Sequence, residues 1–269
     1  MGLPRRFLGM AASFPALKKW LRQKLEAAGY VVINTREEML YARDGIFTFN
    51  NTHFVRDAQF QAAYQRGVQA GQGIDPKMEW RVHVALWVAG CALSVPGDFV
   101  ECGVNAGFVS SAIMQRYEWQ RVDKLFFLVD TFQGPVLSQY SEDEVLRGQK
   151  QVAEEAIARG AYVADLDRIR ANFAQWPNAR IVQGVVPEVL EELTSERVAF
   201  LHLDMNCAHP ERAALEYFWE KLSPGGVVLL DDYSAYHYDA TARAIDDAAK
   251  IRGAEVLSLP TGQGLILKR

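Results

Sequence analysis

The chain has 269 residues, of which 49% are hydrophobic and 23% charged, an ordinary composition for a globular protein with a full core. A formal net charge of −4 provides no overall basic field, so no nucleic-acid partner is expected. No apolar run reaches the roughly 18 residues that a membrane helix needs. The three cysteines are an odd number without metal-ligand spacing. Cys91 and Cys102 lie in apolar runs, which favours buried thiols in a cytoplasmic protein over a secreted disulfide framework.

The first 95 residues are predicted to form a helical cap that is continuous with the rest of the chain. The predicted elements are a helix over 5–28 with a break near Pro15, a short strand at 31–33, an ordered polar loop over 41–56, and helices over 57–70 and 78–93. The first helix is basic and amphipathic, which suits an anionic membrane but more often marks the solvated face of a packed helix. Membrane contact is therefore not predicted, and a homodimer or higher homo-oligomer through this helix stays open.

Predicted strands and helices alternate from residue 96 to residue 269, which is typical of one α/β domain. Strands are predicted over 99–104, 125–129, 180–183, 198–203 and 227–230, and helices over 108–117, 141–159, 164–175, 210–222 and 238–252. A hairpin-like pair at 255–259 and 264–268 closes the chain. Five strands followed by such a pair match the seven-stranded Rossmann-like sheet of class I methyltransferases better than a six-stranded dinucleotide domain.

The stretch over 98–107 joins a buried strand to a helix through a glycine turn. Such a turn directs backbone N–H groups toward whatever lies beyond the carboxyl end of the strand. Gly103 and Gly107 carry no Cβ, so a ligand can approach the backbone, and the acidic Glu101 lies just before the turn. The alternative is a strand–helix turn with convenient glycines and no ligand.

The spacing of the turn argues against a dinucleotide. A G-x-G-x-x-G fingerprint beginning at Gly103 would need glycines at 105 and 108, where the chain has Asn105 and Phe108. NAD is therefore disfavoured. The observed E-x-G-x-x-x-G suits a ligand with an amino acid and a ribose but no pyrophosphate, which describes S-adenosylmethionine.

Carboxylates follow four of the five predicted strands. They are Glu101, Asp130, Asp204, Asp231 and Asp232. Ligands of doubly wound sheets bind at the carboxyl ends of the strands, so we expect these groups at one edge. Asp130 could accept both ribose hydroxyls, or it could cap a helix.

Asp204, Asp231 and Asp232 form the most informative group. Neighbouring strands lie about 4.8 Å apart, so carboxylates at two adjacent strand ends can share one ion. Three carboxylates suit a hard cation such as Mg²⁺, or Mn²⁺ or Ca²⁺, and without one they would repel each other. The alternative is a set of solvated loop acids.

Histidines give a weaker signal. His209 and His237 follow the fourth and fifth strands and could reach a substrate, whereas His202 alternates within the fourth strand and is expected to be a packed, supporting residue. A single histidine is more often structural than catalytic.

Four segments together resemble a known family, the macrocin and mycinamicin (TylF-like) O-methyltransferases. They are Gly97–Val104, Val129–Gly134, Leu201–Asp204 and Leu222–Tyr233, and the terminal stretch from Thr261 to Lys268 also fits. The resemblance implies S-adenosylmethionine- and Mg²⁺-dependent methyl transfer to a hydroxyl, usually on a sugar of a natural product. It also implies that Asp204, Asp231 and Asp232 hold the metal. Residues 205–210 and 134–136 depart from the family pattern beside the expected acceptor site.

The resemblance assigns roles to individual residues. Asp204 is the first candidate for the general base, and His209 or His237 is the second. The expected cofactor residues are Glu101, Gly103, Val104, Asn105 and Gly107 at the methionine end, Asp130 at the ribose with Thr131 and Phe132 after it, and Gln183, Gly184 and Val185 beside the adenine. The expected partner is a small hydroxylated, sugar-like acceptor. A non-catalytic S-adenosylmethionine-binding scaffold of a biosynthetic complex is the alternative function.

Overall fold

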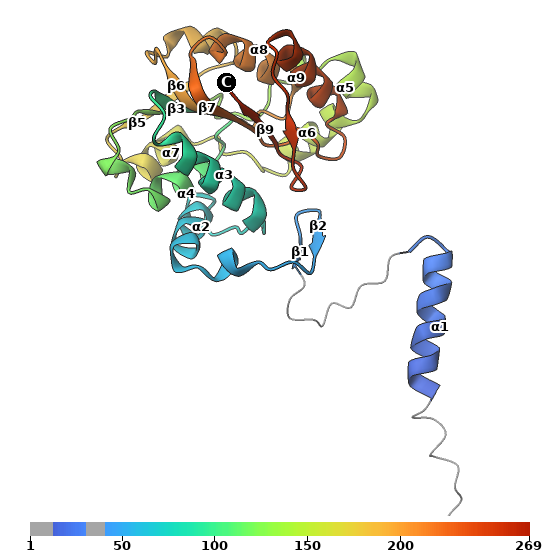
Figure 1. The fold of residues 1–269 in the computed structure, drawn as a ribbon. Helices are drawn as coiled ribbons and strands as arrows, with labels where there is room; N and C mark the ends of the chain where they lie inside the picture. Colours follow the sequence, from blue (N-terminus) through green and yellow to red (C-terminus); the bar gives the residue numbers. More distant parts are fainter. Residues whose placement is uncertain (1–12, 31–40) are drawn as a thin grey trace, which may run out of the picture. The chain divides into compact units, whose positions relative to one another are not determined.

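The computed structural model describes residues 13–30 and 41–269 (Figure 1). The chain divides into two compact units, one formed by residues 1–41 with 47–51 and the other by residues 42–46 with 52–269. The predicted cap over 1–95 is thus shared between both units, because its second and third helices group with the sheet. The predicted strand at 31–33 and the first part of the predicted N-terminal helix lie outside the described residues.

The first unit contains helix α1 (Ser13–Ala27). Pro15 lies in the first turn of this helix, where a missing N–H costs nothing. The break predicted near Pro15 stays a prediction, because the residues before Ser13 lie outside the described part of the chain. An ion pair from Arg22 to Glu26 one turn later lies on its exposed surface. In the described part of the chain, no helix combines the length and the apolar character that crossing a membrane requires.

The second unit is built on one seven-stranded sheet with the order β5-β4-β3-β6-β7-β9-β8. Its strands are β3 (Asp98–Cys102), β4 (Phe126–Asp130), β5 (Ala179–Gln183), β6 (Val198–Leu203), β7 (Leu222–Leu230), β8 (Leu257–Ser258) and β9 (Gly264–Leu267). The first five strands run parallel, and β9 pairs antiparallel with both β7 and β8. The predicted Rossmann-like sheet with a terminal strand pair is confirmed.

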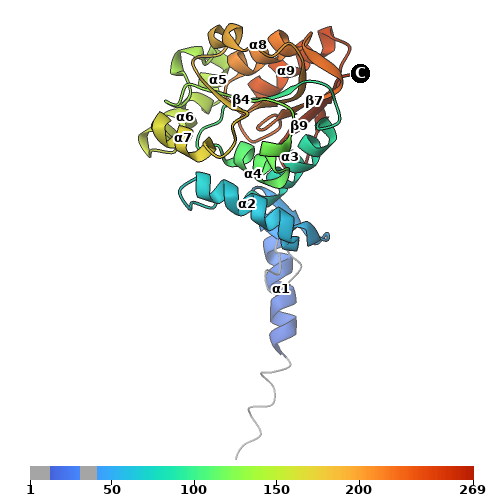
Figure 2. The same ribbon diagram turned by 90° about the vertical axis from the view of Figure 1, so that its left-hand side faces the viewer.

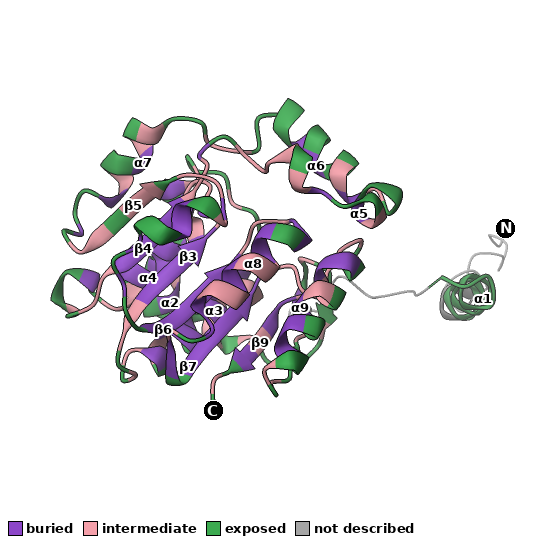
Figure 3. Cartoon of the chain, turned by 90° about the horizontal axis from the view of Figure 1, so that it is seen from above, coloured by how far each residue is buried: buried purple, intermediate pink, exposed green. Residues whose placement is uncertain are grey.

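Helices cover both faces of this sheet, as Figures 1 and 2 show. One face packs against α2 (Ala58–Ala70), α3 (Glu79–Ala92), α4 (Phe108–Arg116) and α7 (Leu166–Phe173), and the other against α8 (Ala208–Phe218) and α9 (Asp239–Ile251). Side chains of a strand alternate between faces, so Phe99 and Phe200 enter the first core while Val100 and Leu201 enter the second. The central strands are therefore buried on both sides (Figure 3).

Three local expectations differ from the structure. The predicted helix over 141–159 is two helices, α5 (Glu142–Leu146) and α6 (Gln149–Ala158), because Gly148 takes a left-handed φ of 82° between them. The predicted loop over 41–56 contains a two-stranded sheet of β1 (Tyr41–Arg43) and β2 (Ile46–Thr48), joined by the turn residues Asp44 and Gly45. Cys91 is exposed rather than buried, whereas Cys102 is buried as predicted.

Candidate functional site

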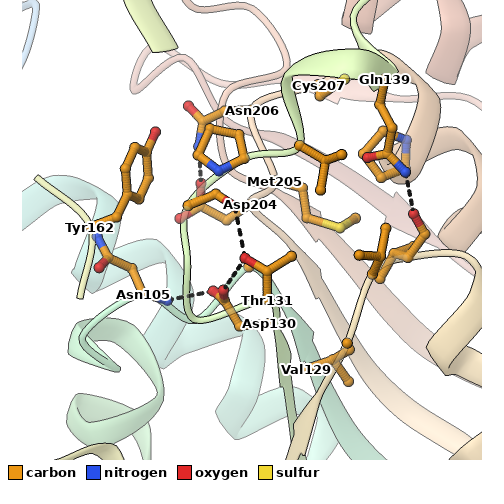
Figure 4. Close-up of a pocket in the computed structure, with 18 residues that line it drawn as sticks. Asn105, Val129, Asp130, Thr131, Gln139, Tyr162, Asp204, Met205, Asn206 and Cys207 are labelled. Atoms are coloured by element: carbon orange, nitrogen blue, oxygen red, sulfur yellow. Dashed lines mark hydrogen bonds between the residues drawn. The ribbon is translucent and has the colours of Figure 1, made fainter. Parts of the chain in front are cut away.

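A pocket lies at the carboxyl ends of the parallel strands (Figure 4). It encloses about 660 Å³ of empty space, including open solvent at its mouth. The loops after β3, β4, β5 and β6 form its walls. Its lining includes Gly103, Asn105, Asp130, Thr131, Gly184 and Val185, all predicted as cofactor residues, together with Asp204.

Asp130 ties two of these loops together. Its Oδ2 accepts hydrogen bonds from the backbone N–H groups of Val104 at 2.7 Å and Asn105 at 2.8 Å, and its Oδ1 accepts from the backbone N–H of Phe132 at 2.6 Å. The carboxylate therefore fixes the glycine turn after β3 to the loop after β4. Its contact with a ribose stays a prediction.

The glycines of the turn are required by packing within the protein. A Cβ at Gly103, whose φ is 93°, would collide with the backbone carbonyl of Asp204, so the turn and the end of β6 approach as closely as backbones can. At Gly107, with a φ of 78°, a Cβ would lie 2.5 Å from the ring of Phe173 on α7. The glycine pattern is thus explained before any ligand is considered.

Of the predicted cofactor residues, all of which lie in the described part of the chain, five do not line the pocket. They are Glu101, Val104, Gly107, Phe132 and Gln183. Phe132 is buried in the core, and the Nε2 of Gln183 donates to the backbone carbonyl of Thr131 at 3.2 Å. Glu101 is almost completely buried and contacts His202 instead.

A buried polar chain crosses β3, β6 and the end of β7. The Oε1 of Glu101 lies 2.9 Å from Nδ1 of His202, and Nε2 of His202 lies 3.7 Å from Oδ1 of Asp231. Burial alone would lower the pKa of His202, but the neighbouring carboxylates of Asp231 and Glu101 raise it to about 10. His202 is fully buried between these two carboxylates, as its position within the strand predicted.

Asp231 is also held by a residue that the sequence did not point to. Nη1 of Arg81, on α3, donates to Oδ2 of Asp231 at 2.7 Å and to Oδ1 of Asp232 at 2.8 Å. Nε of Arg81 donates to Asp44 at 3.0 Å, at the turn between β1 and β2. Arg81 is largely buried, so these pairs are screened little by solvent.

Two of the three predicted metal ligands come within reach of one ion. Ligand atoms of His202, Asp204 and Asp231 all lie within 4.8 Å of one another, whereas Asp232 lies outside this set and pairs with Arg81. Burial and the charges of Asp231 and Asp232 raise the pKa of Asp204 well above its usual range. The pKa of Asp231 is held well below its usual range, because Arg81 and His202 outweigh its burial.

The two histidines proposed as alternative bases do not reach the pocket. His209 is exposed and lines a different hollow between α5, α8 and α9, with Arg212 and Arg243 beside it. The ring of His237 packs at a tilt of 55° against the ring of Tyr236, with centroids 3.9 Å apart, and does not line the pocket. Asp204 is the predicted catalytic residue that the structure does place in the pocket wall.

Tyr162 is a pocket residue that sequence reasoning missed. Asn105 binds the residues on either side of Tyr162. Its Nδ2 donates to the carbonyl of Ala161 at 3.1 Å, and its Oδ1 accepts from the N–H of Val163 at 2.9 Å. Burial and the nearby charge of Asp204 raise the pKa of Tyr162 to about 12, so its hydroxyl is a proton donor. No motif marks this residue, because the loop between α6 and α7 has no repeating pattern.

Comparison with known proteins places the chain in a family. The model of the macrocin-O-methyltransferase (TylF) family matches residues 88–255. The 8-demethyl-8-(2,3-dimethoxy-alpha-L-rhamnosyl)-tetracenomycin-C 4'-O-methyltransferase of Streptomyces olivaceus is 30% identical over 159 residues, which are 57% of this chain and 58% of that protein. The mycinamicin III 3''-O-methyltransferase of Micromonospora griseorubida is 26% identical over 149 residues, which are 52% of this chain and 56% of that protein. The chain thus spans somewhat more than half the length of these curated relatives.

Solved structures support the fold. The O-methyltransferase NovP superposes with a TM-score of 0.58 at 22% identity, over 70% of this chain and 79% of its own. The calicheamicin methyltransferase CalS11 superposes with a TM-score of 0.57 at 14% identity, over 88% of this chain and 98% of its own. Both share the class I methyltransferase architecture of the sheet described above. Because the family match covers more than half of the sequence, the chain belongs to the macrocin-O-methyltransferase (TylF) family.

Proposed function

We propose that the protein is an S-adenosylmethionine- and Mg²⁺-dependent O-methyltransferase that acts on a hydroxyl of a sugar or a glycosylated natural product. The observation that carries this proposal is the position of Asp204. This residue belongs both to the wall of the pocket and to the carboxylate cluster, which consists of Asp44, Asp204, Asp231 and Asp232. A methyl donor in the pocket and an acceptor hydroxyl at the cluster would meet at this residue. The named activities of the two relatives, 4'-O-methylation of a rhamnosyl tetracenomycin and 3''-O-methylation of mycinamicin III, agree with such an acceptor.

The pocket suits the methyl donor. Backbone and side-chain groups of Gly103, Asn105 and Asp130 would face its amino-acid and ribose parts, and Gly184 and Val185 would border the adenine. The remaining wall is mostly apolar, which excludes water around a sulfonium and its methyl group. Tyr162 would close the side of the donor site nearest the carboxylates.

The charges of the cluster suit a divalent cation. Asp44, Asp204, Asp231 and Asp232 supply four carboxylates against the single guanidinium of Arg81, and His202 is already shared with Glu101. The oxygens of Asp204, Asp231 and Asp232 would hold Mg²⁺, which prefers such ligands. Bound there, the ion would lower the pKa of the acceptor hydroxyl.

Asp204 would accept the acceptor proton as the methyl group is transferred. It lines the pocket and belongs to the proposed ligand set, so a hydroxyl bound at the ion would lie beside it. Arg81 and His202 would keep Asp231 ionised and oriented throughout the reaction. The pocket and cluster together would align donor and acceptor for in-line displacement.

Calorimetric titration of S-adenosylhomocysteine, with Mg²⁺ or with EDTA and beside an NAD⁺ control, tests the donor site. Micromolar binding without an NAD⁺ response is expected.

Transfer of labelled methyl groups to a panel of rhamnosyl glycosides then tests catalysis, and Asp204→Asn should retain S-adenosylhomocysteine binding while losing turnover. Binding without transfer to any hydroxylated acceptor would favour a scaffold, and full Mg²⁺-dependent activity in Asp204→Asn would refute the role of Asp204.

A further inference from the structure

Asn206 lies in the pocket wall two residues after Asp204, and its side chain links Asp204 to a distant tyrosine. Its Nδ2 donates to Oδ1 of Asp204 at 3.2 Å (Figure 4), and its Oδ1 accepts from the hydroxyl of Tyr238 at 2.7 Å. Because the tyrosine donates to the amide oxygen, the amide nitrogen is directed toward the carboxylate. The orientation of Asn206 is thus set from outside the loop that carries it.

The backbone of Asn206 is held as firmly as its side chain. Its N–H donates to Oε1 of the buried Glu211 at 3.0 Å. Its carbonyl accepts from the hydroxyl of Tyr140 and from Nε2 of Gln149, each at 3.0 Å. These partners come from α8, from the segment before α5 and from α6, so three separate elements fix a residue whose φ is 58°.

This arrangement leaves the two oxygens of Asp204 in different surroundings. Oδ1 receives the amide of Asn206, whereas no hydrogen bond from the residues that the structure describes reaches Oδ2. A neutral donor orients a carboxylate without cancelling its charge, unlike the guanidinium of Arg81 on Asp231. The carboxylate of Asp204 is thus held in a fixed direction by a neutral partner.

We propose that Asn206 is the positioning residue of Asp204 and that Tyr238 sets the orientation of its amide. The role rests on the proposed function, since it aims Asp204 at the metal and the acceptor. Partners that orient metal-ligating carboxylates change metal affinity by about 10- to 100-fold when they are removed. The same size of effect is expected here.

Two substitutions and one matched control test this role. Asn206→Gly removes the amide while allowing the left-handed backbone, and Tyr238→Phe removes only the hydroxyl that orients the amide. Tyr140→Phe is the control, because it also removes a hydrogen bond from a tyrosine hydroxyl to Asn206, but one to the backbone carbonyl, which Gln149 still holds. The probe is Mn²⁺, titrated by calorimetry into the full chain in the presence of saturating S-adenosylhomocysteine, whose own affinity is measured separately.

The dissociation constant of Mn²⁺ is expected to rise about tenfold or more in Asn206→Gly and several-fold in Tyr238→Phe, while S-adenosylhomocysteine affinity changes less than threefold. Tyr140→Phe should leave both dissociation constants within about twofold of the wild-type values. If the effects came from a general loosening of the loop, this control would change them too. Wild-type Mn²⁺ affinity in Asn206→Gly would overturn the positioning role alone. A wild-type chain that binds the nucleoside product but no Mn²⁺ would overturn the proposed metal site and this role with it.

Discussion

Arg81 and His202 place positive charge against Asp231, whereas Asp204 receives its hydrogen bond from the neutral amide of Asn206. The two carboxylates follow neighbouring strands, yet the pKa of Asp231 is lowered and that of Asp204 is raised. Opposite shifts in adjacent acids separate a permanent anion from a group that can take up a proton. The opposite pKa shifts of the two acids therefore follow from the different charges of their contacts.

Glu101 is predicted to bind the methionine end of the cofactor, but in the structure it is buried against His202. Because it contacts His202 and does not line the pocket, Glu101→Gln should weaken Mn²⁺ or Mg²⁺ binding about tenfold through Asp231. S-adenosylhomocysteine affinity should change less than threefold. Calorimetry of both ligands measures this, with Glu144→Gln, another fully buried glutamate, as the control. If Glu101→Gln instead lost affinity for S-adenosylhomocysteine and kept its affinity for the metal, Glu101 would belong to the donor site, as the sequence predicted.

The charge of His202 makes stability depend on pH. Its pKa rises from 6.5 to about 10 on folding, so its contribution is fully present below pH 6.5 and is lost as the pH rises through about 10. The free energy of unfolding should therefore fall from pH 7 to 10, by up to about 1.4 kcal/mol per pH unit from this group. Urea unfolding across this range should give a flatter profile for His202→Gln, and equal slopes would show that His202 is neutral in the folded protein.

At the scale of elements, the turns after the strands set the geometry of the site. Non-glycine residues with left-handed φ values follow four of the parallel strands: Asn105 after β3, Phe132 after β4, Asn206 after β6 and His237 after β7. Such conformations persist where surrounding contacts hold them, and they gather at functional ends of folds. For Asn105, Phe132 and Asn206 the contacts are the hydrogen bonds of Asp130 and Glu211.

Two glycines with similar backbone conformations separate the cost of strain from the cost of collision. Gly148, between α5 and α6, has a φ of 82° and open space around its missing Cβ, so Gly148→Ala should cost about 1 kcal/mol of stability. Gly103→Ala adds a collision with the carbonyl of Asp204, so it should cost several times more and weaken S-adenosylhomocysteine binding at least tenfold. Urea unfolding and calorimetry measure both, and equal costs would show that β3 and β6 can separate freely.

The sequence predicts elements better than it predicts how they meet. The strands follow from apolar runs, and the carboxylates after them follow from the rule that parallel strands end at one edge. Gly148 could have signalled the break between α5 and α6, because helices often end at a left-handed glycine. Arg81 and Tyr162 could not be found this way, since each reaches the site from a segment far away in the sequence.

At the scale of the whole molecule, the carboxylate cluster depends on residues outside the family match. The match begins at residue 88, whereas Arg81 and Asp44 lie before it. Arg81 donates hydrogen bonds both to Asp231 and to Asp44. All three lie in the second compact unit, so the sheet and its preceding helices form one site-bearing body. The charge balance of the proposed metal site therefore includes residues that lie before the segment matched by the family model.

Metal removal should be visible in the stability of this whole body. The carboxylates repel one another, so Mg²⁺ should bind the folded chain in preference to the unfolded one and stabilise it by about 2.7 kcal/mol at 100 times its dissociation constant. For a chain of this length that corresponds to a rise of several degrees in Tm over the value in EDTA. Asp204→Asn should lose most of this rise, whereas Asp247→Asn, an exposed acid on α9, should keep it. A rise that persists in Asp204→Asn would place the ion elsewhere, because a site that needs this carboxylate loses its affinity when the charge is removed.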